Sequence, residues 1–368
     1  MKKVFFSIVL CCACNCLFAQ NNPSKVSSSG SNKFVVYGNA EAKYTATKGE
    51  AGFGDINFKP IFLWKISDKL FAEAETEIET GDGAVDLGLE YANMCYIVNS
   101  GLILHAGRFL PKFGAYRGRM GEAFINRFTS DPVGFGDGGI GAMNETGFGA
   151  LGGFPVGDMK MNYDVYISNG PQLLSDSVNA GQFEYEAYTT NNKATAIGGR
   201  FAILPFANSS FEIAYSFQHK SKTGDTGSPY ENIGVTMQAV DFNFLQNITP
   251  ISSTIKLLGE LKHQKTDNTT YYKDNGDAIN FNNVATAYYI SGSLRPSLAD
   301  NKFLRNIEIA ARYSYFKTPV DAPWGGENFK QFEGALDYWL HWNDVVKFCY
   351  VKQKGSPAEF NAQIVFGF

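Results

Sequence analysis

Polar and apolar residues alternate with a period of two along almost the whole chain, and this pattern limits the possible folds more than any other feature. In the segment 39–43, for example, Asn39, Glu41 and Lys43 alternate with alanines. Successive side chains of a strand point to opposite faces, so the pattern predicts strands with one polar and one apolar face. No segment with a helical period is long enough for a separate domain. We therefore expect a single all-β domain.

The N-terminal segment has the composition of an export signal. Two lysines precede an apolar run at residues 4–17, and Ala19 supplies the small residue before the predicted cleavage site. We expect residues 1–19 to be a signal peptide and residues 20–368 to be the mature chain.

The composition of the mature chain narrows the fold and function classes. It contains no stretch of the roughly 18 apolar residues that a transmembrane helix requires, and the other way across a bilayer is a closed barrel. The full sequence contains 15% aromatic and 18% charged residues, which suits strands that are apolar on one face only. Beyond residue 19 there are 36 acidic and 30 basic residues, a net charge of −6, which argues against nucleic-acid binding. Only Cys95 and Cys349 remain, too few for a disulfide framework.

The spacing of the alternating segments predicts about 16 strands of roughly 9 to 14 residues, close to the length of a tilted transmembrane strand. These strands are expected to begin near Lys33, Gly52, Leu70, Asp86, Gly101, Asn144, Met159, Ala194, Phe211, Asn232, Ser252, Val284, Asn306, Lys330, Val345 and Glu359. Connections between successive strands alternate between the two ends of a barrel. Every very long connection falls at the same end, namely 110–143, 169–193, 220–231, 266–283 and 317–329. The sequence therefore predicts a transmembrane antiparallel β-barrel with a long third external loop.

The last predicted strand carries an apolar stripe that ends in an aromatic residue. The stripe consists of Phe360, Ala362, Ile364, Phe366 and the terminal Phe368. This pattern resembles the assembly signal of Gram-negative outer-membrane barrels. The resemblance implies that the barrel assembly machinery recognises this strand through Phe366 and Phe368. It also implies that the protein lies in the cell outer membrane, in contact with its lipid.

The longest connection, FLPKFGAYRGRMGEAFINRFTSDPVGFGDGGIGAMNET, follows the fifth predicted strand. Its first half is basic and contains Lys112, Arg117, Arg119 and Arg127, offset by Glu122. The layout resembles 16-strand diffusion porins, whose third external loop folds into the lumen. The segments GRFLPKFGAY and FINRF also resemble Bacteroidota relatives of the phosphate-selective porin family. The resemblance implies a water-filled channel for passive diffusion of small polar or ionic solutes, and a homotrimer.

The third predicted strand carries glutamate at four successive alternate positions, Glu73, Glu75, Glu77 and Glu79. Charged side chains on the lipid face cost roughly 2 to 4 kcal/mol near the midplane, so this stripe is expected to face the lumen. We expect the basic loop to fold against the stripe and form the pore constriction. The alternative is a solvated acidic strand in a wide lumen, with the basic loop outside. The other predicted lumen positions are Lys160, Asn162, Asp164, Lys256, Glu260, Lys262, Glu308, Arg312, Gln331, Glu333 and Asp337. They carry both signs and no arginine-rich ladder, so phosphate specificity is not predicted.

Other chemical signals in the sequence are weak. Gly134, Gly136 and Gly139 match the spacing of the glycines in a dinucleotide-binding motif. However, no predicted strand directly precedes them and no predicted helix follows. None of the four histidines has a partner at metal-ligand spacing, so no cofactor or metal is expected. No motif joins a nucleophile to a base, so we do not expect an enzyme. Two alternatives stay open: an outer-membrane barrel enzyme of the phospholipase or protease type, and a substrate-specific gated channel.

Overall fold

The computed structural model describes residues 33–81 and 84–368, and it shows sixteen antiparallel strands in a closed barrel. The first eight strands around the ring are β1 (Phe34–Thr47), β2 (Glu50–Lys65), β3 (Leu70–Gly81), β4 (Ala84–Asn99), β5 (Leu102–Phe109), β6 (Glu145–Val156), β7 (Met159–Ser168) and β10 (Ala196–Leu204). The other eight are β11 (Phe211–Lys220), β12 (Val235–Ile248), β13 (Ser253–Thr266), β16 (Val284–Arg295), β17 (Ile307–Lys317), β18 (Asn328–Trp339), β19 (Val345–Gln353) and β20 (Ala358–Gly367). The ring closes where β1 pairs with β20. The predicted fold class and strand number are therefore confirmed.

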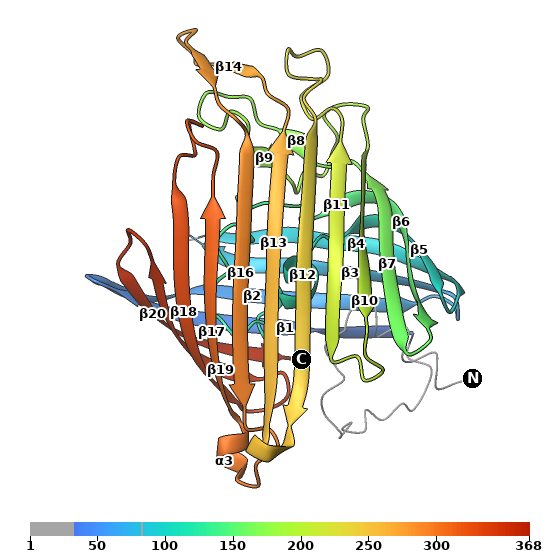
Figure 1. Ribbon diagram of the computed structural model, residues 1–368, viewed down its shortest axis with the longest axis vertical. Coiled ribbons are helices and arrows are strands. Elements are labelled where there is room, and N and C mark those ends of the chain that lie inside the picture. Colours follow the sequence, from blue (N-terminus) through green and yellow to red (C-terminus); the bar gives the residue numbers. More distant parts are fainter. Residues whose placement is uncertain (1–32, 82–83) are drawn as a thin grey trace.

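The strands of opposite walls cross at a steep angle, because each strand is tilted relative to the barrel axis. In Figure 1 the strands β12, β13 and β16 run lengthwise, whereas β1 and β2 behind them run across the picture. No helix in the described part of the chain is long and apolar enough to span a membrane.

The alternating pattern sorts side chains between the two faces of the wall. On β17, Ile309 is 59% exposed on the outer face, whereas its neighbour Glu308 is 3% exposed on the inner face. The C-terminal strand behaves in the same way, because Phe360 and Phe366 are exposed and Asn361 is buried. The barrel thus has an apolar outside and a polar inside, as the sequence predicts.

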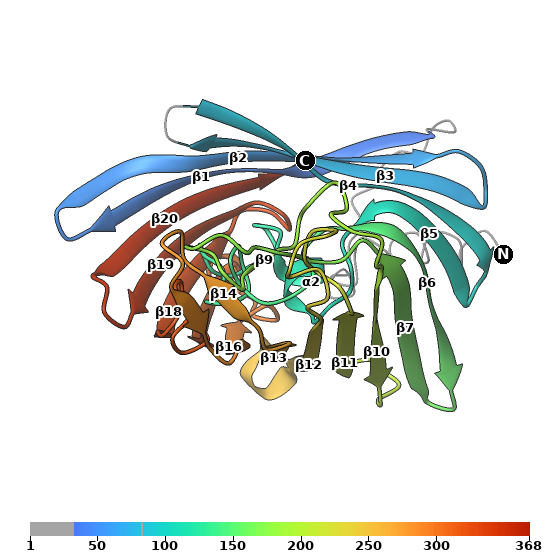
Figure 2. The same cartoon turned by 90° about the horizontal axis from the view of Figure 1, so that it is seen from above.

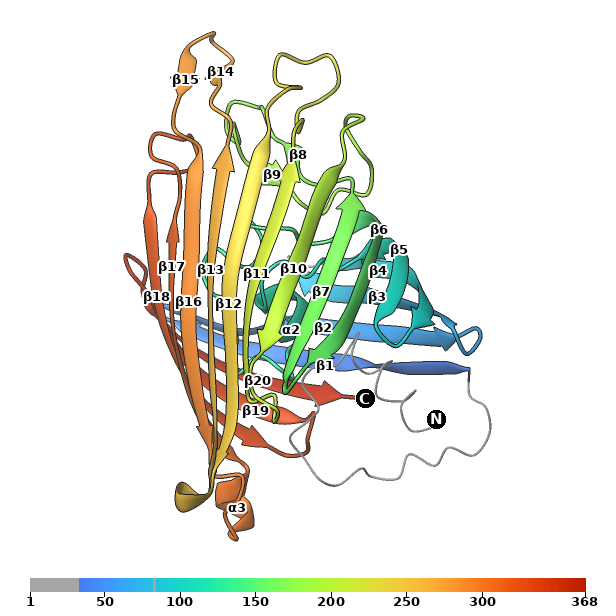
Figure 3. The same cartoon turned by 45° about the vertical axis from the view of Figure 1, so that its right-hand side comes forward.

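Connections of different length separate to the two ends of the barrel. The long-loop end carries the connections that contain β8 (Gln172–Leu173) with β9 (Phe183–Glu184), and β14 (Thr270–Tyr272) with β15 (Ala278–Asn280) (Figure 3). The short-turn end carries η1 (Thr249–Ile251) and α3 (Lys302–Arg305). The partition follows the predicted one. The predicted signal peptide at residues 1–19 lies outside the described residues.

Candidate pore constriction

The connection between β5 and β6, residues 110–144, lies inside the barrel, and we call it the inner loop. It contains one short helix, α2 (Tyr116–Met120), among the residues that the structure describes. Seen from above, α2 lies within the ring of strands (Figure 2). The inner loop is therefore a lining of the lumen rather than an external loop.

An apolar cluster holds the inner loop against one side of the wall. Phe113, Tyr116 and Phe135 of the loop are almost fully buried. They pack with Ala287 and Tyr289 of β16, and the Phe135 and Tyr289 rings meet edge to face with centroids 4.9 Å apart. Because the wall presents small residues here, the aromatic rings of the loop have room to bury their surface.

A carboxylate of β13 fixes the start of α2. The backbone N–H groups of Ala115 and Tyr116 donate to Glu260 Oε2 at 2.9 and 2.8 Å. The preceding Gly114 has φ +72°, and a Cβ there would lie 1.7 Å from Glu260 Oε1. Only glycine allows the chain to pass this close to the carboxylate in a left-handed conformation.

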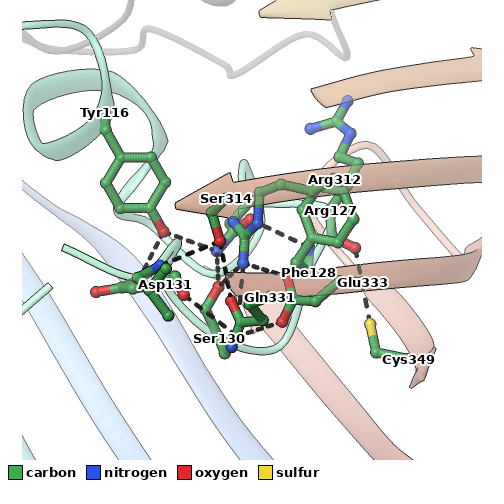
Figure 4. A network of polar contacts seen from close by, with 12 residues as sticks. Tyr116, Arg127, Phe128, Ser130, Asp131, Arg312, Ser314, Gln331, Glu333 and Cys349 are labelled. Carbon is green, nitrogen blue, oxygen red and sulfur yellow. Dashed lines mark hydrogen bonds and ion pairs between the residues drawn. The ribbon is translucent and has the colours of Figure 1, made fainter. Parts of the chain in front are cut away.

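A buried ion pair holds the middle of the inner loop (Figure 4). Arg312 of β17 pairs with Glu333 of β18, and their side chains are only 2% and 1% exposed. Arg312 also donates to the Ser130 carbonyl at 2.6 Å, and Ser130 Oγ donates to Glu333. The Tyr116 hydroxyl donates to Asp131 at 2.6 Å, which ties this part of the loop to α2.

Three further charged wall contacts complete the attachment. Lys347 of β19 donates to the Ala123 carbonyl at 2.6 Å, Lys262 of β13 donates to the Ile140 carbonyl at 2.9 Å, and Glu308 of β17 pairs with Arg127 at 3.0 Å. Buried charges need partners of this kind, since an unpaired one costs several kcal/mol. The wall from β13 to β19 is therefore covered by the inner loop.

The opposite wall, formed by β1 to β4, is covered only in part: Asn39 and Glu75 are buried, whereas other charged side chains remain accessible. Lys59 of β2 and Glu77 of β3 form an ion pair at 2.5 Å, and their side chains are 21% and 18% exposed. Glu73 accepts a hydrogen bond from Asn93 of β4 at 3.1 Å. The inner loop contributes Glu122 to this side, which accepts from Asn39 of β1 at 2.6 Å. Burial raises the pKa of the Glu122 carboxyl, although Lys59 and Asn39 favour its charged form.

The structure places the predicted glutamates on the inner face of β3, but it does not pair them with the loop in the expected way. Arg117 contacts Glu186 of the next long connection at 2.8 Å, and Arg127 contacts Glu308 on the covered wall. Lys112 is half-buried in the inner loop. The side chain of Arg119 lies outside the described part of the structure. The expected pairing is thus wrong for Arg117 and Arg127, because each has a nearer carboxylate that sequence alone does not bring close.

Several residues that attach the inner loop were not recognised as such from the sequence. Glu260, Lys262, Glu308, Arg312 and Glu333 belong to the predicted polar lumen positions, whereas Lys347 does not. Alternation indicates which face such a residue takes, but it carries no information about what lies across the lumen.

The glycines 134, 136 and 139 lie in the inner loop, where Gly134 packs against Ala287 and Phe316. The described residues contain no group of three or more His, Cys, Asp or Glu that could hold a metal ion.

Solved structures of outer-membrane channels are similar to this chain along most of its length. Salmonella typhi OmpF, in complex with daunomycin, has a TM-score of 0.57 and 12% identity over 91% of this chain and 97% of that one. The outer membrane channel DcaP of Acinetobacter baumannii has a TM-score of 0.58 and 12% identity over the same shares of the two chains. The anion-selective porin from Comamonas acidovorans has a TM-score of 0.51 and 13% identity over 91% and 99%.

These similarities concern the fold. The chain matches no protein-family model and no curated protein sequence. With identities of 12 and 13%, the shared feature is the three-dimensional arrangement. The chain therefore has the closed, sixteen-stranded antiparallel barrel fold found in these porin structures.

Proposed function

We propose that this protein is a porin of a Gram-negative outer membrane, which forms a water-filled channel for passive diffusion of small polar or ionic solutes. One observation carries the proposal: the inner loop covers one wall of a closed barrel and leaves charged side chains of the other wall accessible. Lys59 and Glu77 are about one-fifth exposed, whereas Arg312 and Glu333 are 2% and 1% exposed. This contrast is expected of a lumen that is narrowed on one side and wet on the other.

The pore constriction is proposed to lie between the inner loop and β1 to β4. Its residues are those predicted from the sequence, with roles adjusted to the contacts: Glu73, Glu75, Glu77 and Glu79 on the wall, and Lys112, Arg117, Arg119, Glu122 and Arg127 on the loop. Arg127 acts as an anchor on the covered wall. The excess of carboxylates on the open side favours cations over anions. Acidic and basic side chains both occur at these positions, which supports a general pore. A pore specialised for phosphate is not supported, although residues 107–116 resemble the phosphate-selective porin family.

The glutamate stripe provides a direct test of the constriction. In the variant Glu75→Gln/Glu77→Gln we expect a weaker cation preference, because two carboxylates are removed while Lys59 remains. The reversal potential under a salt gradient measures this change. An unchanged reversal potential and conductance would show that the glutamate stripe does not form part of the constriction.

Export and assembly follow from the same proposal. Residues 1–19 would direct export, and the last strand, with Phe366 and Phe368, would be recognised by the barrel assembly machinery. A homotrimer is also proposed, and large exposed apolar residues of β2 and β4 support it. Among them Phe53 and Leu87 are 87% and 73% exposed, and such surfaces mark contacts with lipid or with another subunit.

A liposome-swelling assay tests passive diffusion. Liposomes that contain the purified, folded protein should swell in solutions of small sugars, and the rate should fall steeply with sugar size. Liposomes with heat-denatured protein are the control. Absence of swelling with a demonstrably folded barrel would reject the open channel and favour a gated channel or an enzyme.

A further inference from the structure

A segment of the connection between β7 and β10 passes over the lumen from one wall to the other. At one end the Tyr185 hydroxyl donates to Gln264 of β13. Three residues later the Tyr188 hydroxyl donates to the Leu89 carbonyl of β4 at 3.4 Å. The Tyr188 ring also lies on the Arg108 guanidinium, whose central carbon is 4.2 Å from the ring centroid. We call residues 185–189 the strap.

The two walls that the strap contacts are nearly opposite each other. Around the ring, β4 and β13 are separated by six strands on one side and by eight on the other. A segment that touches both must cross the opening, and β9, which leads into the strap, lies within the ring when seen from above (Figure 2). The strap therefore lies across the path of a solute that enters from the long-loop end.

The middle of the strap is bound to the inner loop. Glu186 accepts a hydrogen bond from Arg117 of α2 at 2.8 Å, and its carbonyl accepts from Arg108 of β5 at 3.0 Å. Asn144 donates to both Glu186 and Glu90, at 3.4 and 3.0 Å. These contacts join the strap, the inner loop and the wall into one network, and charged hydrogen bonds of this kind are stronger than neutral ones.

The end of the strap is fixed by neighbouring connections. The Thr189 carbonyl accepts from Gln172 of β8. Just beyond the strap, Asn191 donates to the Thr223 carbonyl at 2.8 Å and Asn192 donates to the Gly224 carbonyl at 2.9 Å. A segment held at both ends and in the middle keeps its position while solutes pass.

The strap is also accessible to water. The Glu186 side chain is 37% exposed and Tyr188 is 59% exposed. Asp137, which lies 4.0 Å from Arg117, has a side chain that is 90% exposed. Around the strap the carboxylates of Glu186, Glu90 and Asp137 outnumber the guanidinium groups of Arg108 and Arg117.

We propose that the strap forms a second constriction, in series with the inner loop, at the long-loop end of the pore. Tyr188 limits the size of solutes that enter, and Glu186 favours small cations over anions. This inference rests on the proposed pore function. It assigns selectivity to two residues outside the third connection, on which the sequence prediction concentrated.

Single-channel recordings of Tyr188→Ala and Glu186→Gln test the strap. Removal of the Tyr188 ring should raise the conductance about twofold, because an obstacle in the solute path is lost. Glu186→Gln should shift the reversal potential toward lower cation preference. Tyr272→Ala on β14 is the matched control, since Tyr272 is an equally exposed tyrosine of the long-loop end. Variants that fold, as shown by heat-modifiable migration on gels, but conduct like the wild type would overturn the inference.

Chemical labelling provides a second readout that does not depend on the stability of the strap. In Glu186→Cys, a bulky cationic thiol reagent should reduce the current in single steps, whereas Tyr272→Cys should not respond. The wild type is a suitable background because Cys95 and Cys349 are buried. A fully labelled Glu186→Cys channel with unchanged current would place the strap outside the conduction path. If the folded wild-type protein gave no current, the proposed pore function would be rejected, and this inference with it.

Discussion

Gly114 shows how a single residue determines the position of the inner loop. Gly114→Ala would place a methyl group on the Glu260 carboxylate in a backbone conformation that L-residues rarely adopt. We expect this strain to destabilise the attachment of α2 to the barrel wall by about 1–3 kcal/mol. The resulting loop motion should appear as increased current noise in single-channel recordings.

Gly118 provides the matched control for this change. It lies in α2, is exposed, and has no atom within 4 Å of the position of a Cβ. Gly118→Ala should leave the current trace unchanged. Equal noise from the two alanine variants would contradict the role assigned to Gly114.

Glu122 is expected to make ion selectivity depend on pH. Burial raises the pKa of its carboxyl, so the group binds a proton at a higher pH than a free glutamate, whose pKa is about 4.3. The charged form is present above the raised pKa and is lost as the pH falls through it. Cation preference should therefore decrease on acidification, and it should decrease less in Glu122→Gln. Reversal potentials recorded at several pH values compare the two proteins, and identical profiles would exclude Glu122 from the conduction path.

The inner loop is the element whose attachment the structure explains most fully. Arg312→Met would leave Glu333 buried without its partner, and breaking a buried pair in this way costs about 3–5 kcal/mol. The middle of the loop should then detach from β17 and β18, which should lower the temperature of heat modification and raise current noise. In the double variant Arg312→Met/Glu333→Leu both charges are absent, so most of the stability should return. A single variant as stable as the wild type would contradict the anchoring role.

At the level of elements, the sequence predicts the wall better than it predicts the contents of the barrel. None of the sixteen predicted strand starts differs from the observed start by more than three residues, because alternation and turn residues are local signals. The partners of Arg117 and Arg127 are Glu186 and Glu308, which lie far along the chain. Such pairs depend on how the loop folds across the lumen, and no local pattern encodes that path.

At the level of the whole molecule, the barrel has one covered wall and one open wall. The inner loop fills the side of β13 to β19 with aromatic rings and buried ion pairs, while the carboxylates of β3 and β4 border the remaining space. The strap crosses that space near the long-loop end. If the proposed pore function holds, a solute passes two narrow regions, both with more acidic than basic groups.

A planar-bilayer recording of the purified mature protein under a potassium chloride gradient tests whether the barrel is an open pore. An open pore bordered by the glutamate stripe predicts stable, ohmic current steps and a reversal potential whose sign indicates a preference for potassium over chloride. A folded barrel that gives no conductance would contradict the proposed open pore.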